Sequence, residues 1–192
     1  MRTSDGQVSG DHVRPTDAAR GPDAVIAELV TMGKRCIDTV NASSGRVIGA
    51  GIGAPGPLDF ARGLVLLTPN LGWVDLPLRD AISAGLGLPA ALDNDANCAI
   101  LGESWIGAAR GAEIAIGVTI GTGIGGGIVL GGRLHHGISD CAGEIGHPTL
   151  EMNGRRCGCG NYGCLEAYAS GPAIALRAVE QVRSGAPSLL SA

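Results

Sequence analysis

The stretch Cys157-Gly158-Cys159-Gly160-Asn161-Tyr162-Gly163-Cys164-Leu165-Glu166 follows shortly after Gly143-Glu144-Ile145-Gly146-His147 and says more about the fold than any other part of the chain. Three thiolates and one imidazole can supply the four ligands of a closed tetrahedral zinc site. Glycine reaches backbone conformations closed to other residues, so the glycines let this short segment wrap around one ion. The spacing predicts a structural zinc held by His147, Cys157, Cys159 and Cys164. Three buried or disulfide-linked cysteines are the alternative.

Two carboxylates, Glu144 and Glu166, flank the predicted ligands. A bound metal would fix the positions of these acids, and ionised oxygens accept strong hydrogen bonds from hydroxyl groups. The second nitrogen of His147 could face the same molecule while the first binds zinc. The segment therefore predicts a binding site for a molecule rich in hydroxyls.

A second informative pattern is Asp93-Asn94-Asp95-Ala96-Asn97. It stands between a short apolar run, residues 89–92, that predicts a strand and a helical pattern over residues 96–106. Open α/β sheets bind ligands at such strand ends. There Asp95 could accept the proton of an attacking hydroxyl, or it could simply cap the helix. Asp93 is the better candidate for a structural role.

The glycine-rich run from Gly121 to Gly127 formally matches the dinucleotide-binding pattern G-x-G-x-x-G. That motif requires a strand, a turn and then a helix. Here the apolar runs 114–120 and 127–130 predict a strand on each side instead. We therefore expect a hairpin whose backbone N–H groups and Thr122 hydroxyl cradle phosphate, with a plain glycine hairpin as the alternative.

The rest of the chain reads as mixed α/β, with a boundary near residue 111. Apolar residues at helical spacing predict a helix from Pro22 to about Val40, and further helices are expected over residues 78–84 and 161–184. Residues 47–53 predict a strand that runs into a Gly-Pro loop.

Composition narrows the class of protein. The 192 residues are 45% hydrophobic with a formal net charge of −4, and basic residues are adjacent only in the pairs Lys34-Arg35 and Arg155-Arg156. A nucleic-acid surface needs concentrated positive charge, so none is expected. No run of about 18 apolar residues predicts a membrane span, and the polar start does not resemble a signal peptide. Six cysteines with metal-type spacing favour a reducing cytoplasm.

The motifs together resemble the ROK family, which groups bacterial sugar kinases such as glucokinase with related sugar-responsive repressors. Besides the segments already quoted, the resemblance includes the stretches 51–59 and 68–73 and extends over residues 21–183. It implies an α/β protein with the actin-like (ribonuclease H-like) sugar-kinase fold in two lobes.

The resemblance implies ATP-dependent phosphorylation of a hexose, with magnesium and a structural zinc, and Asp95 as the catalytic base. The nucleotide phosphates would lie on Gly121, Thr122 and Gly123. Family members are commonly dimers or tetramers, so a homo-oligomer is an expectation. The effector-binding part of a repressor and a non-catalytic zinc-stabilised remnant are the alternatives. The implied sugar contacts are Gly56, Asn70, Asn94, Asp95, Glu144, His147 and Glu166.

The chain departs from the family pattern at its ends. Kinases of the family carry an Asp-x-Gly-Gly-Thr phosphate loop on a first strand, and residues 1–192 contain no such sequence. We therefore expect a fold incomplete at both termini. Its expected parts are a polar lead over 1–20 that is the remnant of a missing hairpin, a partial amino-terminal lobe over 21–111 and a partial carboxyl-terminal lobe over 112–192. Without the loop, this chain by itself is expected to phosphorylate no hexose.

Overall fold

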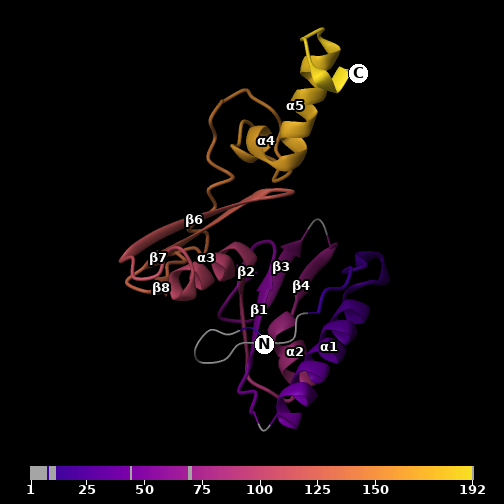
Figure 1. Cartoon of the computed structure of the whole chain (residues 1–192), viewed down its shortest axis with the longest axis vertical. Helices are drawn as coiled ribbons and strands as arrows, with labels where there is room; N and C mark the ends of the chain where they lie inside the picture. The colour runs from indigo at the N-terminus through magenta and orange to yellow at the C-terminus, as the bar shows by residue number, and fades with distance from the viewer. Residues whose placement is uncertain (1–7, 9–11, 44, 69–70, 192) are drawn as a thin grey trace. The chain divides into compact units, whose positions relative to one another are not determined.

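The computed structural model describes residues 8, 12–43, 45–68 and 71–191. Packing divides the chain into two compact units, Met1–Cys98 and Ala99–Ala192, which are described separately below (Figure 1). The boundary between the two units falls inside the helix Asp95–Ile106. The three parts expected from the sequence stay a prediction. The predicted sugar contact Asn70 and residues 1–7 and 9–11 of the predicted polar lead lie outside the described residues.

Two helices cover the core of the first unit. The helix α1 (Pro22–Ala42) follows the short 3-10 turn η1 (Ala18–Arg20) and begins with a proline at its first turn, where the missing N–H costs no hydrogen bond. It confirms the predicted helix and packs against α2 (Leu78–Leu86). Val25 of α1 and Ile82 of α2 are buried in the same cluster. Burial of these apolar side chains stabilises the unit.

A parallel strand pair positions the acidic segment. The strands β1 (Ala50–Ala54) and β5 (Ala90–Asn94) pair from Ala50 opposite Ala90 to Ala54 opposite Asn94. The strand predicted from residue 47 begins three residues later, because its partner strand begins only after Pro89, which has no N–H to donate. Both strands therefore end at the same edge of the pair. Gly56 comes shortly after the last residue of β1, and Asp95 comes directly after the last residue of β5.

The sequence reading missed an antiparallel sheet of three short strands: β2 (Leu58–Asp59), β3 (Leu64–Thr68) and β4 (Trp73–Leu76). Arg79 stabilises its first turn by donating to the carbonyl oxygens of Phe60, Ala61 and Arg62 at 3.1–3.4 Å. Val65 is fully buried, and Trp73 is 4% exposed. This sheet therefore completes the core of the unit.

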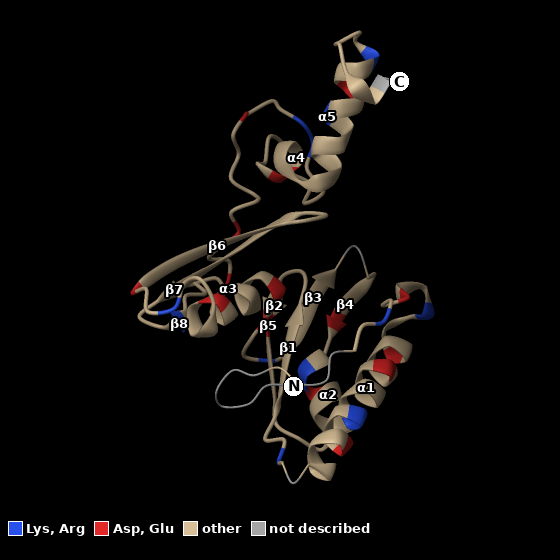
Figure 2. Cartoon of the chain, in the orientation of Figure 1, with Lys and Arg blue, Asp and Glu red and all other residues tan. Residues whose placement is uncertain are grey.

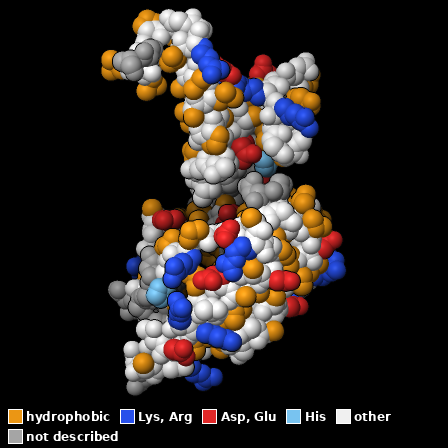
Figure 3. All heavy atoms as spheres, turned by 90° about the vertical axis from the view of Figure 1, so that its right-hand side faces the viewer, with side chains coloured by type: hydrophobic (Ala, Val, Ile, Leu, Met, Phe, Trp, Pro, Cys, Tyr) orange, Lys and Arg blue, Asp and Glu red, His pale blue; other side chains and the backbone are white. Residues whose placement is uncertain are grey.

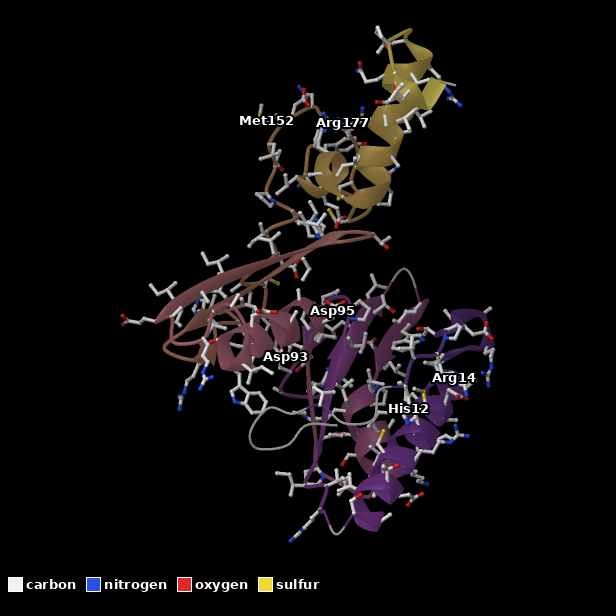
Figure 4. The ribbon with its side chains drawn as sticks, in the orientation of Figure 1. His12, Arg14, Asp93, Asp95, Met152 and Arg177 are labelled. Atoms are coloured by element: carbon white, nitrogen blue, oxygen red, sulfur yellow. The ribbon has the colours of Figure 1, made fainter. Side chains whose placement is uncertain are left out.

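A groove runs along β1 between α1 and α2. It has a volume of about 590 Å³ and is lined mainly by apolar side chains, with His12 and Arg14 at its margin (Figure 4). Among the described residues, β1 pairs only with β5. On the face shown in Figure 3, hydrophobic side chains are scattered among charged ones. Lys and Arg are likewise interleaved with Asp and Glu (Figure 2).

The helix α3 (Asp95–Ile106) leads into the second unit, whose sheet consists of β6 (Ile114–Ile120), β7 (Ile124–Leu130) and β8 (Arg133–Leu134). The predicted strand 114–120 is confirmed. The next strand starts at 124 and not at 127, because Gly125, Gly126 and Gly127 pair with Thr119, Val118 and Gly117. A strand follows the glycine turn, so the predicted hairpin is confirmed.

The sheet packs on α3 through small residues. A Cβ atom added to Gly117 would lie 2.7 Å from the side chain of Ile100, and Ile100, Ala115 and Val129 form the core of the unit. Alternate residues on the other face of β6 are exposed: Ile114, Ile116, Val118 and Ile120.

The chain ends in the helices α4 (Glu166–Ala169) and α5 (Gly171–Arg183), followed by the 3-10 turn η2 (Leu189–Ser191). The helix expected from residue 161 begins only at 166, since the preceding residues form the cysteine loop. Ser170 separates α4 from α5 and caps α5 by accepting a hydrogen bond from Ala173 N–H at 3.4 Å. No helix of the described residues is long and apolar enough to span a membrane.

Candidate functional site

The four predicted metal ligands come together in the second unit. One ligand atom each of His147, Cys157, Cys159 and Cys164 lies within 4.8 Å of every other. Cys159 Sγ is 3.8 Å from Cys164 Sγ, and Cys157 Sγ is 3.8 Å from His147 Nδ1. A tetrahedral zinc with Zn–S bonds of about 2.3 Å needs ligands about 3.8 Å apart. The cluster therefore fits zinc, and the sulfur atoms are too far apart for a disulfide.

Backbone hydrogen bonds shape the cysteine loop. Cys157 N–H donates to Asn161 O at 2.8 Å, and Gly160 N–H donates to Cys157 O at 3.1 Å. Gly160 has a φ of +94°, which only glycine adopts freely. A Cβ on Gly163 would overlap the carbonyl oxygen of Glu151. The glycines therefore permit both the turn and the close packing that bring the thiols together.

The thiols differ in acidity. Burial raises the pKa of Cys157 to about 12 and also raises the pKa of Cys164. A hydrogen bond from the Asn161 backbone lowers the pKa of Cys159. A divalent cation at the cluster must displace the protons of Cys157 and Cys164. Metal binding therefore releases protons and strengthens as the pH rises.

Both flanking acids contact this cluster. His147 Nε2 lies 3.8 Å from Glu144 Oε2, so the ring presents Nδ1 to the cysteines and Nε2 to a carboxylate, the arrangement common around metal-bound histidine. Glu166 lies on the other side, with Oε1 3.5 Å from Cys157 Sγ. The two carboxylates thus lie beside the ligand cluster, as the sequence predicts.

The glycine hairpin is tied to the same region. Its three-residue loop, 121–123, joins β6 to β7. Gly171 N–H donates to Gly121 O at 2.9 Å, and Ile124 N–H donates to Glu166 Oε2 at 2.8 Å. Thr122 is exposed at the tip. The structure therefore brings the predicted phosphate loop next to Glu166 and to the first residue of α5, contacts that sequence reasoning missed.

The acidic segment lies in the first unit at the end of β5 (Figure 4). Asn94 Oδ1 accepts hydrogen bonds from the N–H groups of Ala96 at 2.9 Å and Asn97 at 3.2 Å, so Asn94 caps α3. Asp93 Oδ1 accepts from Asn94 N–H and from Asn97 Nδ2. Asp95 is exposed, and its Oδ1 accepts a hydrogen bond from the N–H of the neighbouring Ala96 at 2.9 Å. These contacts leave the Asp95 carboxylate accessible to a ligand.

Gly56 has a structural reason to be glycine. Its φ is +92°, and a Cβ there would overlap the carbonyl oxygen of Leu67 in β3. It follows β1 as Asp95 follows β5, so the two residues stand at the same end of the parallel pair. In this unit the structure therefore gathers Gly56, Asn94 and Asp95, and in the other it gathers Glu144, His147, Glu166 and the hairpin loop.

Comparisons with known proteins identify the family of the chain. The model of the ROK family matches residues 2–188. A glucokinase of Halalkalibacterium halodurans is 38% identical over 190 residues, which are 98% of this chain and 58% of that protein. A xylose repressor of Bacillus subtilis is 36% identical over 170 residues, 88% of this chain and 44% of the repressor.

A solved structure supports the fold. The ROK family glucokinase of Streptomyces griseus in complex with glucose and AMPPNP matches with a TM-score of 0.68 and 39% identity, over 84% of this chain and 50% of that one. The mixed α/β architecture is thus the actin-like fold of ROK sugar kinases. The chain spans about half the length of the relatives that it matches.

Proposed function

Because the chain belongs to the ROK family, we propose that it takes part in ATP-dependent phosphorylation of a hexose, as a glucokinase-like sugar kinase. The observation that carries this proposal is that Asn94 and Asp95, at the end of β5, have different surroundings. Asn94 caps α3, so the exposed carboxylate of Asp95 is not needed for capping. A carboxylate placed in this way can act as the base of phosphoryl transfer.

Asp95 would accept the proton of the sugar hydroxyl while that oxygen attacks the γ-phosphorus of ATP. The bond from the γ-phosphorus to the bridging oxygen then breaks, and ADP leaves. Catalysis in this reaction consists mainly of positioning and charge stabilisation. We assign the phosphate contacts to the hairpin loop Gly121, Thr122 and Gly123, with magnesium accompanying the nucleotide.

We assign the sugar contacts to the residues of the family pattern, named here unit by unit. Charged oxygens of Glu144 and Glu166 suit hydroxyl donors, and His147 presents Nε2 on the side of Glu144. We add Asn94 and Gly56 from the first unit, and Asn70 on the family pattern alone. When bound, zinc would hold His147 and the three cysteines in a fixed arrangement. Its role is therefore structural, orienting the residues that contact the sugar.

A second candidate function is the effector-binding part of a sugar-responsive repressor. The match to a xylose repressor over 88% of this chain favours it. Such a protein would bind a sugar through the same residues and would also bind DNA through a further segment. Sugar binding is therefore common to both functions, whereas turnover and DNA binding separate them.

We propose a cytoplasmic location for either function. All six cysteines are free thiols, with no disulfide between them. Thiols of this kind persist in reducing compartments. A homo-oligomer, dimer or tetramer, stays a proposal from the family pattern.

A chimeric enzyme tests the function, since this chain spans about half of its relatives. Residues 21–183 would replace the matching segment of the Halalkalibacterium halodurans glucokinase, and ATP-dependent glucose phosphorylation would be measured. Turnover within about tenfold of the parent enzyme is expected for a kinase segment. A chimera that contains zinc and binds sugar but forms no sugar phosphate would favour the repressor instead.

A further inference from the structure

The carboxylate of Glu166 joins two parts of the second unit. Its Oε2 accepts a hydrogen bond from Ile124 N–H at 2.8 Å, and its Oε1 lies 3.5 Å from Cys157 Sγ. Ile124 is the first residue after the hairpin loop, and Cys157 belongs to the ligand cluster. One half-buried side chain therefore touches both the phosphate hairpin and the metal cluster.

The backbone strengthens this connection. Glu166 N–H donates to Gly146 O at 2.9 Å, directly before the ligand His147. A Cβ on Gly146 would overlap the carbonyl oxygen of Ile124. At the other side of the hairpin loop, Gly171 N–H donates to Gly121 O at 2.9 Å. Both sides of the loop are thus held by the segment that follows the ligand Cys164.

Glycine at position 123 makes room for the carboxylate. A Cβ added there would lie 2.5 Å from Glu166 Oε2, so any larger residue would push the carboxylate away from Ile124. At Gly121 an added Cβ would meet no atom within 4 Å. The two glycines of the loop therefore differ, and only Gly123 is required by the Glu166 contact.

We propose that Glu166 is a positioning residue that holds the hairpin loop 121–123, so that metal binding at the cysteine cluster sets the conformation which the loop offers to phosphate. The phosphate role rests on the proposed function, whereas the contact itself does not. A hydrogen bond to a carboxylate is stronger than one between neutral groups. Metal that orders Cys157 and Cys164 would also restrict Glu166, which lies two residues beyond Cys164.

Amide hydrogen exchange at Ile124 tests the proposal in the purified 192-residue protein, followed by NMR with zinc bound and after chelation. Chelation is expected to speed exchange about tenfold or more, the loss typical of a hydrogen bond to a charged group. Glu166→Ala should speed it equally with zinc present. Glu166→Gln keeps an acceptor oxygen and should restore most of the protection. Glu151→Gln, a carboxylate bonded to Tyr168 in the same unit, serves as the charge-matched control.

A second pair of variants covers the case in which Glu166→Ala loses zinc. Gly123→Ala keeps every ligand and the carboxylate, and it should speed exchange at Ile124, whereas Gly121→Ala should not. Wild-type exchange at Ile124 in Gly123→Ala, or an Ile124 amide indifferent to chelation, would overturn the proposal. The measurement involves no phosphorylation, so failure of the kinase assay and failure of this test remain distinct results.

Discussion

At the scale of single residues, the cysteines carry the most specific information. Their spacing predicted a cluster with His147, and the structure brings all four ligand atoms within 4.8 Å of one another. The spacing was informative because a short loop with glycines can close around one ion in few ways. The Glu166 contact to Ile124 spans 42 positions in sequence. Such a contact depends on tertiary packing, so no local sequence pattern predicts it.

Cys159→Ser tests the metal assignment. We expect the purified variant to hold far less than one zinc per chain, because a hydroxyl replaces a thiolate in a closed four-ligand site. Residues 144–166 should then lose order, since structural zinc binding is coupled to folding. Elemental analysis measures the zinc content. Cys141→Ser, at an exposed thiol that donates to Ser139 O, is the control and should keep its zinc.

Asn94 and Asp95 are predicted to have different roles although they are neighbours. Asn94→Ala should lower the free energy of unfolding by about 1 kcal/mol, because two N–H groups of α3 lose their cap. Asp95→Asn should change it much less. Denaturant unfolding measures both. A larger loss of stability for Asp95→Asn would show that Asp95 is the structural residue.

At the scale of elements, long amphipathic helices were predictable and short strands were not. The pattern of α1 gave its start at Pro22, where proline fits the first helical turn. The strands β2, β3 and β4 have two to five residues. Runs so short show no clear alternation, and their pairing depends on turns such as the one that Arg79 holds. The prediction began β7 at residue 127 and not at 124, because the glycines at its start are typical of a turn.

The ion pair of Arg155 with Glu180 connects the residues just before the ligand Cys157 to α5. The hydrogen bond with Arg155 lowers the pKa of Glu180, so the pair stabilises the fold above the unfolded-state pKa of a glutamate, about 4.3. This contribution is lost as the pH falls through the lower folded-state pKa. Glu180→Gln should therefore reduce Tm slightly at pH 7.

The same variant should match the wild type at a pH well below the folded-state pKa of Glu180, where the carboxylate is protonated in the folded and in the unfolded state. Scanning calorimetry across this pH range checks the convergence. Glu113→Gln, at the exposed start of the β6 hairpin, supplies the control and should leave Tm unchanged at either pH. A Tm difference for Glu180→Gln that persists at low pH would mean that packing, and not charge, explains the contact.

At the scale of the whole molecule, the residues assigned to the proposed function are divided between the two units. The proposed base Asp95 follows β5 in Met1–Cys98, and the predicted metal ligands and the hairpin belong to Ala99–Ala192. Five motifs in order along the chain predicted this family, and the family model matches residues 2–188. Sequence could not separate kinase from repressor, because the chain is similar to a glucokinase and to a xylose repressor at nearly equal identity, 38% and 36%.

The most direct test is the turnover of the glucokinase chimera with and without Asp95→Asn. Asparagine keeps the shape and the hydrogen-bonding oxygen of the side chain but cannot accept a proton. We predict that kcat falls by about 100-fold or more, while the dissociation constant for glucose measured by calorimetry changes little. An Asp95→Asn chimera that phosphorylates glucose at the rate of its unsubstituted parent would contradict the assignment of Asp95 as the base.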